Sequence, residues 1–429
     1  MTLYSTEVEE DFSDWLGATR SGDLDCVKEI ILKKAKGANL KTIANYKDSN
    51  GQSLFHFAAS TGRIHICKYL VEDLKLNVDD FLNDEGFTPL HSAIIWEQYA
   101  VAVYLLENGA NPNAVANMGT AALHMAANMG CPNLLEYLIS KGAEIDTVPG
   151  AIGTPLQRAS FSNLKDNMKF LLDNHANPNG MSPAILFTPL YLSILNGSID
   201  SVNMLLQAGA SPNLVSRGET PLGVAAAMGD VEIIKCLLNA EADPNVPNRA
   251  SKMPIEFAAL LDRREAVRCL LSVTSRISTI VDWSVEGILN FIGSNEAGKK
   301  LKETFEKCYL LEKSKGEDAF KKKDYYAAIK WYSEALTHFP PNPTVIYSNR
   351  SLCWIRLNKG DYALEDAKCC IRLKPDWPKG YYRVGMAWML LKDYKNAAAA
   401  FDDGCELWKP SVSEASEMVT VLCGKQNSE

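Results

Sequence analysis

The sequence predicts an all-α protein that consists of two helical solenoids in tandem. Two families of internal repeats predict this fold, one with a period close to 33 residues and one with a period of 34 to 35 residues. The composition agrees, because 47% hydrophobic and 22% charged residues are typical of a folded chain rather than a disordered one. Such short units cannot bury an apolar face alone, so neighbouring units must stack.

The first repeat family is marked by a recurring proline. Successive steps are 33, 33, 34, 32 and 33 residues, with alanine at the second place. The series is Pro89, Ala122, Pro155, Pro189, Pro221 and Pro254. A second signature follows each of the first five members, at Gly109–Asn113, Gly142–Glu144, Ala176–Asn179, Gly209–Asn213 and Ala242–Asn245. This regularity predicts one structural unit repeated along the chain.

Each unit of this family is predicted to be a pair of helices. Threonine before the proline, as at Thr88, is an N-cap followed by a first helical residue that needs no N–H. The second helix ends in a leucine pair, after which glycine supplies a left-handed C-cap. His175 and Glu241 replace two of these glycines, so we expect a positive φ at both. The unit resembles the ankyrin repeat, which implies about seven or eight repeats over residues 11–272.

Three histidines, His56, His91 and His124, recur at one position of this repeat. In ankyrin repeats that position makes a hydrogen bond between loops, so the resemblance implies a structural role for all three. We therefore expect no metal site and no catalytic residue here.

Residues 273–305 are expected to form a linker with one short helix, because Val285 to Ile292 is amphipathic. Gly293, Gly298 and Lys299 match the spacing of a phosphate-binding loop. Such a loop needs a strand before it and a serine or threonine after the lysine, whereas Lys300 stands there. We expect no nucleotide and no other cofactor.

The second repeat family places small residues at matching positions, with steps of 35 and 34 residues. They are Gly316, Ala328 and Ala335, then Ser351, Ala363 and Cys370, then Gly385, Ala397 and Gly404. Small residues at these places let two helices cross closely, and aromatic residues fill the remaining space. The segment resembles three tetratricopeptide (TPR) repeats over residues 306–410. Residues 411–429 are expected to form a capping helix and tail.

Four residues make this segment similar to the carboxylate-clamp class of TPR domains, which bind acidic C-terminal tails of cytosolic heat-shock chaperones. They are Lys313, Asn349, Lys379 and Arg383. Lys379 and Arg383 are one helical turn apart and so share a face. Three cations and an amide suit a peptide with two adjacent carboxylates.

Glu317 departs from the clamp pattern, which has asparagine there. It stands one turn after Lys313 and could neutralise that lysine. It would also face the ligand's terminal carboxylate, and such a contact near 4 Å costs about 4 kcal/mol at an effective dielectric constant of about 20. A third of that energy is about a tenfold loss of affinity. An ordinary basic groove, or a different ligand class, is therefore an equal alternative.

The net charge of −8 disfavours a general nucleic-acid binder, and no apolar stretch is long enough to insert into a membrane. The basic runs at Lys33–Lys36, Lys299–Lys302 and Lys321–Lys323 are interpreted as solvated helix faces. The acidic N-terminus and the scattered cysteines favour the cytoplasm, with the nucleus as a further compartment.

The whole chain resembles ankyrin–TPR proteins of the type common in plants, which implies an adaptor that binds proteins. We expect the ankyrin face to bind one partner and the TPR groove to bind a peptide or C-terminal tail of another. The alternative is a chaperone cofactor that binds heat-shock chaperone tails. An enzyme is not expected, because no nucleophile with its base, metal set or phosphate loop is found.

Overall fold

The computed structural model describes residues 17–34, 47–148, 150, 153–182 and 186–407. In these residues the regular structure is helical, apart from three isolated β-bridges, as the sequence predicts. The chain divides into two compact units, Met1–Leu192 with Asn203–Ser211, and Ser193–Val202 with Pro212–Glu429. None of the described helices is long and apolar enough to cross a membrane.

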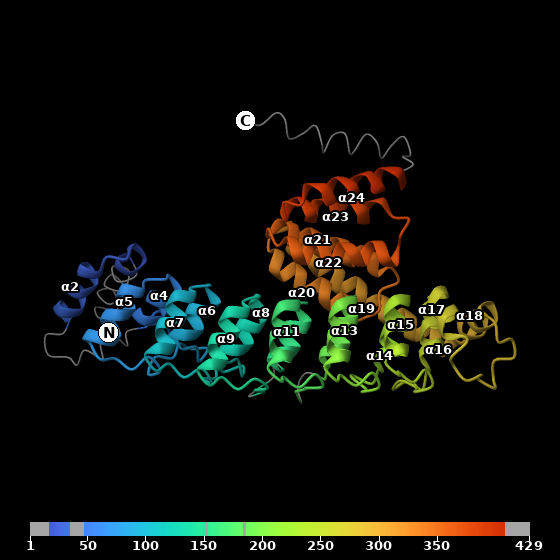
Figure 1. The fold of residues 1–429 in the computed structure, drawn as a ribbon, viewed down its shortest axis with the longest axis horizontal. Coiled ribbons are helices and arrows are strands. Elements are labelled where there is room, and N and C mark those ends of the chain that lie inside the picture. The colour runs from blue at the N-terminus through green and yellow to red at the C-terminus, as the bar shows by residue number, and fades with distance from the viewer. Residues whose placement is uncertain (1–16, 35–46, 149, 151–152, 183–185, 408–429) are drawn as a thin grey trace, which may run out of the picture. The chain divides into compact units, whose positions relative to one another are not determined.

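The helices of the first repeat family come in pairs (Figure 1). In chain order they are α2 (Leu24–Lys34), α4 (Leu54–Ser60), α5 (Ile64–Lys68) with the π-helical turn η1 (Tyr69–Asp73), α6 (Pro89–Ile95), α7 (Tyr99–Glu107), α8 (Ala122–Met129), α9 (Pro132–Ser140), α10 (Pro155–Phe161), α11 (Lys165–Asp173), α12 (Pro189–Leu195), α13 (Ile199–Gln207), α14 (Pro221–Met228), α15 (Val231–Asn239), α16 (Pro254–Leu260) and α17 (Arg264–Leu270).

The remaining helices begin with α18 (Val285–Ser294), which includes the amphipathic segment predicted from the sequence. They continue with α19 (Glu296–Lys321), α20 (Tyr325–Leu336), α21 (Pro343–Arg356), α22 (Gly360–Leu373), α23 (Pro378–Leu390) and α24 (Tyr394–Leu407). Gly293 and Gly298 both lie in helices, so the motif that imitates a phosphate-binding loop forms no such loop. The capping helix expected at 411–429 lies outside the described residues.

The predicted helix caps of the first repeat family are confirmed. The side chains of Thr88, Thr154 and Thr220 each accept a hydrogen bond from the backbone N–H three residues later, and proline follows each threonine. His175 and Glu241 have φ of 67° and 65°, as their positions require. These local interactions fix where each helix begins and ends, independently of the packing between repeats.

Two of the three recurring histidines, His56 and His124, make the expected hydrogen bonds between loops. Nδ1 of His124 accepts from the N–H of Ala121 at 3.2 Å, and Nε2 lies 3.0 Å from the carbonyl oxygens of Thr147 and Gly153. His56 bonds in the same way to Ser53 and to the Phe87 carbonyl. Burial lowers the pKa of His124 to about 4, so the ring is neutral at pH 7.

In the TPR module the small residues let helices approach as predicted. A Cβ on Gly316 would lie 2.6 Å from Tyr332, and one on Gly385 would lie 2.4 Å from Phe401. Each helix from α19 to α24 packs on the next one in the chain. This antiparallel order places the first helices of the three repeats, α19, α21 and α23, where their side chains can form one surface.

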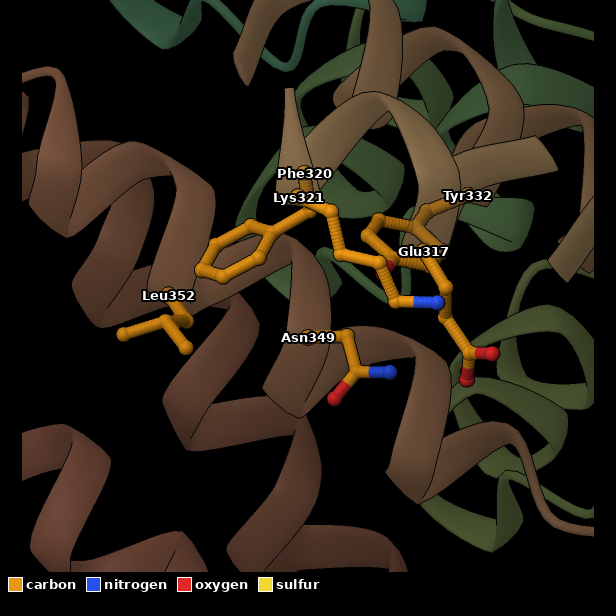
Figure 2. A pocket seen from close by; sticks show the side chains of 6 residues that line it. All are labelled: Glu317, Phe320, Lys321, Tyr332, Asn349 and Leu352. Atoms are coloured by element: carbon orange, nitrogen blue, oxygen red, sulfur yellow. The ribbon is translucent and has the colours of Figure 1, made fainter. Parts of the chain in front are cut away.

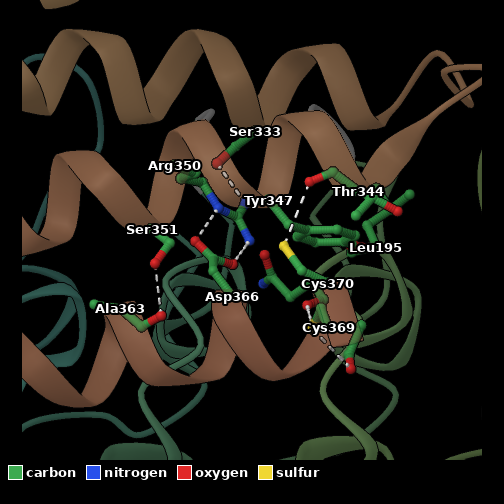
Figure 3. A network of polar contacts seen from close by, with 12 residues as sticks. Leu195, Ser333, Thr344, Tyr347, Arg350, Ser351, Ala363, Asp366, Cys369 and Cys370 are labelled. Atoms are coloured by element: carbon green, nitrogen blue, oxygen red, sulfur yellow. Dashed lines mark hydrogen bonds and ion pairs between the residues drawn. The ribbon is translucent and has the colours of Figure 1, made fainter. Parts of the chain in front are cut away.

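Within the second unit, helices α21 and α22 also pack against the turns that join helices in the last ankyrin repeats. We call Tyr347, Cys369 and Arg372 the docking face, and Figure 3 shows the first two of these residues. The Tyr347 hydroxyl donates to the Leu195 carbonyl at 2.6 Å, and Arg372 Nη2 lies 2.7 Å from Asp230 Oδ2. A Cβ on Gly197 would lie 2.9 Å from the sulfur of Cys369.

A second contact of the same unit involves Arg263, which follows α16. Its Nη1 donates to the carbonyl of Pro341 at 2.7 Å, and its Nε donates to the carbonyl of Ala227 at 2.8 Å. Nearby, the rings of Phe257, Phe305 and Phe339 pack with centroids 5.2 to 6.1 Å apart. The TPR module is thus joined to the last ankyrin repeats by buried contacts as well as by the chain.

Candidate functional site

The predicted site residues lie on the first helices of the three TPR repeats. Lys313 and Glu317 are on α19, Asn349 is on α21, and Lys379 and Arg383 are on α23. We call these five residues the groove. Their helices are fixed in position because α19 packs on α20, α20 on α21, and α21 on α23.

Glu317 and Asn349 line the same hollow, whose volume is about 220 Å³ (Figure 2). The other residues of the hollow are Phe320, Lys321, Tyr332 and Leu352. The hollow combines carboxylate, amide and ammonium groups with aromatic and aliphatic side chains. Burial first, together with the Glu317 charge, raises the pKa of Tyr332, so its hydroxyl stays protonated.

Glu317 pairs with Lys313, as the one-turn spacing suggested. Lys313 Nζ lies 2.8 Å from Glu317 Oε1, and the two side chains are 26% and 41% exposed. The hydrogen bond to this carboxylate raises the pKa of Lys313. An exposed pair of this kind contributes only about 0.5 kcal/mol or less, so a ligand could rearrange it at little cost.

Lys379 and Arg383 have no carboxylate partner among the described residues. Arg383 is 8% exposed, and its Nε lies 3.3 Å from both the carbonyl and the hydroxyl of Ser348, the neighbour of Asn349. Burial lowers the pKa of Arg383. Partial burial, and then the charge of Arg383, lower the pKa of Lys379. Two adjacent cations in this state attract an anion.

The structure therefore connects the predicted residues in two sets. One set is Glu317 and Asn349, which share the hollow, with Lys313 held to Glu317. The other set is Lys379 and Arg383, of which Arg383 contacts Ser348, the neighbour of Asn349 in the sequence. A ligand along this surface meets four cations, counting Lys321, and one carboxylate.

Sequence reasoning missed one polar residue of the hollow, Lys321. It belongs to a basic run that was interpreted as a solvated face, and its Nζ does lie 3.4 Å from Asp318 in an exposed pair. Its spacing of four residues from Glu317 on one helix was the signal that could have identified it. In the described part of the chain, no His, Cys, Asp and Glu side chains are grouped so that they could hold a metal ion.

Comparisons with known proteins agree with the two repeat families. The family model for ankyrin repeats in three copies matches residues 15–116, 123–216 and 190–280, more than half of the chain. The model described as "Serine/threonine-protein kinase BSK1-like, TPR repeats" matches residues 294–384.

Two curated relatives each match one region. The putative palmitoyltransferase ZDHHC13 of Danio rerio is 31% identical over 209 residues, which are 48% of this chain and 31% of that protein. Hsp70-Hsp90 organizing protein 3 of Arabidopsis thaliana is 43% identical over 116 residues, which are 26% of this chain and 21% of that protein. This chain thus spans less than a third of either relative.

Among solved structures, the ankyrin repeat domain of Bcl-3 is 25% identical, with a TM-score of 0.46, and the match covers 52% of this chain and 99% of that one. Ankyrin and TPR repeats are interaction modules rather than enzymes. The chain belongs to the ankyrin-repeat family, carries TPR repeats in its C-terminal part, and is an adaptor of the protein-interaction class.

Proposed function

We propose that the TPR groove of this adaptor binds an acidic peptide segment of one protein while the ankyrin repeats bind another. The observation that carries the proposal is the pair Lys379 and Arg383, two neighbouring cations without a carboxylate partner in the described residues. The whole chain has a net charge of −8, so a local cluster of cations on it favours an acidic ligand by contrast with the rest of the surface.

In this proposal the two binding functions follow the two repeat families. The ankyrin module over residues 11–272 and the TPR module over residues 306–410 each bind a protein partner. Lys313, Asn349, Lys379 and Arg383 contact the peptide, and no nucleic acid or inserted membrane segment takes part. The cytoplasm is the compartment in which we expect this adaptor to act.

The second candidate is a chaperone cofactor that binds the acidic C-terminal tail of a heat-shock chaperone. It is favoured by the 43% identity to an Hsp70-Hsp90 organizing protein and by the four residues that match the clamp pattern. Its distinguishing property is that binding depends on the free C-terminal carboxylate of the ligand.

The test is a titration of the full chain with a fluorescent peptide that ends in several glutamate and aspartate residues. The control peptide has glutamine and asparagine at the same places. We expect micromolar binding of the acidic peptide alone, weakened at least about tenfold by Lys379→Ala, which is about 1.4 kcal/mol. Lys395→Ala, which removes an exposed lysine on α24, is the matched control and leaves the affinity unchanged. Equal binding of both peptides, or of neither, contradicts the proposal.

A further inference from the structure

We infer that the groove takes an internal acidic segment of its partner, so that the peptide chain passes through the hollow without ending there. This inference rests on the proposed function and names its ligand class more narrowly. The observation behind it is that a carboxylate, Glu317, and an amide, Asn349, line one hollow together (Figure 2).

The Glu317 carboxylate is partly exposed and pairs with Lys313. Its Oε1 accepts a hydrogen bond from Lys313 Nζ at 2.8 Å. The side chain is 41% exposed, so the carboxylate is accessible to a ligand. An ionised carboxylate only accepts hydrogen bonds, so a ligand group that bonds to Glu317 must donate one.

A chain end differs from a chain interior in the groups that it offers to Glu317. A free terminal carboxylate has no N–H to donate and carries the same charge as Glu317, so the two groups repel each other. An internal peptide unit has one N–H and one carbonyl oxygen. Its N–H can donate to Glu317, and its carbonyl can accept from the Asn349 amide or the Lys321 ammonium, both of which line the same hollow.

Beyond the hollow, the ligand continues toward α23. Arg383 contacts Ser348, which is next to Asn349 in α21, so its guanidinium lies against the helix that carries Asn349. Lys379 stands one helical turn before Arg383 on α23. Acidic side chains of the ligand pair there with Lys379 and Arg383, whose charges have no carboxylate partner in the described structure. The ligand is thus recognised through its main chain at the hollow and through its carboxylates beside it.

The test uses the full chain and three versions of one acidic peptide. The first ends in the acidic residues with a free carboxylate, the second has an amidated end, and the third continues with glycine and serine beyond the acidic residues. We expect the amidated and the extended peptides to bind at least as tightly as the free peptide. Glu317→Gln keeps the size of the side chain and removes its charge, and we expect it to strengthen binding of the free peptide about tenfold.

Two other outcomes have different meanings. If the free peptide binds about tenfold or more tightly than the other two, the groove takes a chain end. This inference is then overturned, while the proposed binding of acidic peptides stands. If none of the three peptides binds, the proposed function fails, and the inference fails with it. A loss of all binding only in Glu317→Gln would contradict the donor-acceptor argument and assign Glu317 a structural role, which circular dichroism of the variant would reveal.

Discussion

The docking face and the groove lie on the same three-repeat module but differ in whether their polar groups are paired within the chain. On the docking face, Tyr347 and Arg372 are hydrogen-bonded to the last ankyrin repeats, and the donors and acceptors are matched. In the groove, Lys379 and Arg383 lack a carboxylate partner among the described residues, and Glu317 pairs with Lys313, a partly exposed lysine of the same helix. Both regions contain cations, so the presence of a positive charge alone does not separate them.

This difference separates the polar groups that stabilise the module from those that are available to a ligand. Removing a buried cation that has a carboxylate partner lowers stability, because the carboxylate is then left buried without a compensating charge. A cation without a partner contributes little to folding, because its removal leaves no other charge uncompensated. Substitutions of both kinds of group test this distinction.

The largest effect is expected from the ion pair inside the module. Arg350 donates two hydrogen bonds to the Asp366 carboxylate, from Nη2 at 2.7 Å and from Nε at 2.9 Å, and its Nη1 donates to the Ser333 hydroxyl (Figure 3). Asp366→Ala leaves a buried guanidinium without its carboxylate, so we expect the free energy of unfolding to fall by about 3 to 5 kcal/mol. Hydrogen exchange of the α21 and α22 amides measures the loss.

The control is a double substitution, Asp366→Leu with Arg350→Met, which removes both charges and keeps most of the volume. Because no charge is then left unpaired, we expect much of the lost stability to return. If the double variant is less stable than Asp366→Ala, the cost comes from packing rather than from the unpaired charge.

The ankyrin repeats offer a second case of fully paired polar groups, which pH can test. The pKa of His124 is lowered to about 4 by burial, against 6.5 in an unfolded chain. Below pH 6.5 the His124 ring binds a proton in the unfolded state but not in the folded state. The contribution of His124 to the free energy of unfolding is therefore fully present above pH 6.5, and it falls by about 3 kcal/mol as the pH drops toward 4.

The chain itself supplies the control for His124. Gln157 occupies the matching position of the next repeat, where its Oε1 accepts from the N–H of Thr154 at 2.7 Å without being able to titrate. We expect His124→Gln to stay within about 1 kcal/mol of the parent at pH 7 and to lose less stability on acidification. Urea midpoints at pH 7 and pH 4.5 give the comparison, and an unchanged pH dependence would mean that other groups dominate it.

A smaller effect is expected at the docking face itself. Arg372→Ala removes charge-assisted hydrogen bonds to Asp230, which is 3% exposed and also caps α15 through the N–H of Ile233. We expect a loss of about 2 kcal/mol. It should appear as faster hydrogen exchange in α15 and α22 together, because the two helices share this contact. Faster exchange in α22 alone would show that the pair does not join the two modules.

Sequence reasoning predicted the interior of each repeat well, because the signals there are local. A threonine cap, a proline at the first helical position or a positive φ at His175 depends on neighbours within a few residues. The same holds for the groove, where Lys313, Glu317 and the cations of α23 lie at one-turn spacings on single helices.

The docking face could not be predicted in this way. Tyr347 meets Leu195 across 152 positions of the sequence, and Arg372 meets Asp230 across 142. The Leu195 carbonyl stands at the end of a helix, and Asp230 already has a local role as the N-cap of α15, so nothing in the repeat pattern assigns either to a contact with the TPR module. The hollow lies between these cases, because Asn349 was predicted through the clamp resemblance, whereas Lys321 was interpreted as part of a solvated face.

The smallest effect on stability is expected for Lys379→Ala, and it is the direct counterpart of Arg372→Ala. Lys379 is exposed, lies 5.9 Å from the Trp377 ring and has no carboxylate partner among the described residues, while Arg383 repels it. Its removal should change the free energy of unfolding by no more than about 0.5 kcal/mol, although it weakens peptide binding. Urea midpoints of the two variants, measured side by side, test the comparison. If Lys379→Ala is as destabilising as Arg372→Ala, the groove helps to hold the fold, and the separation between a folding face and a binding face is wrong.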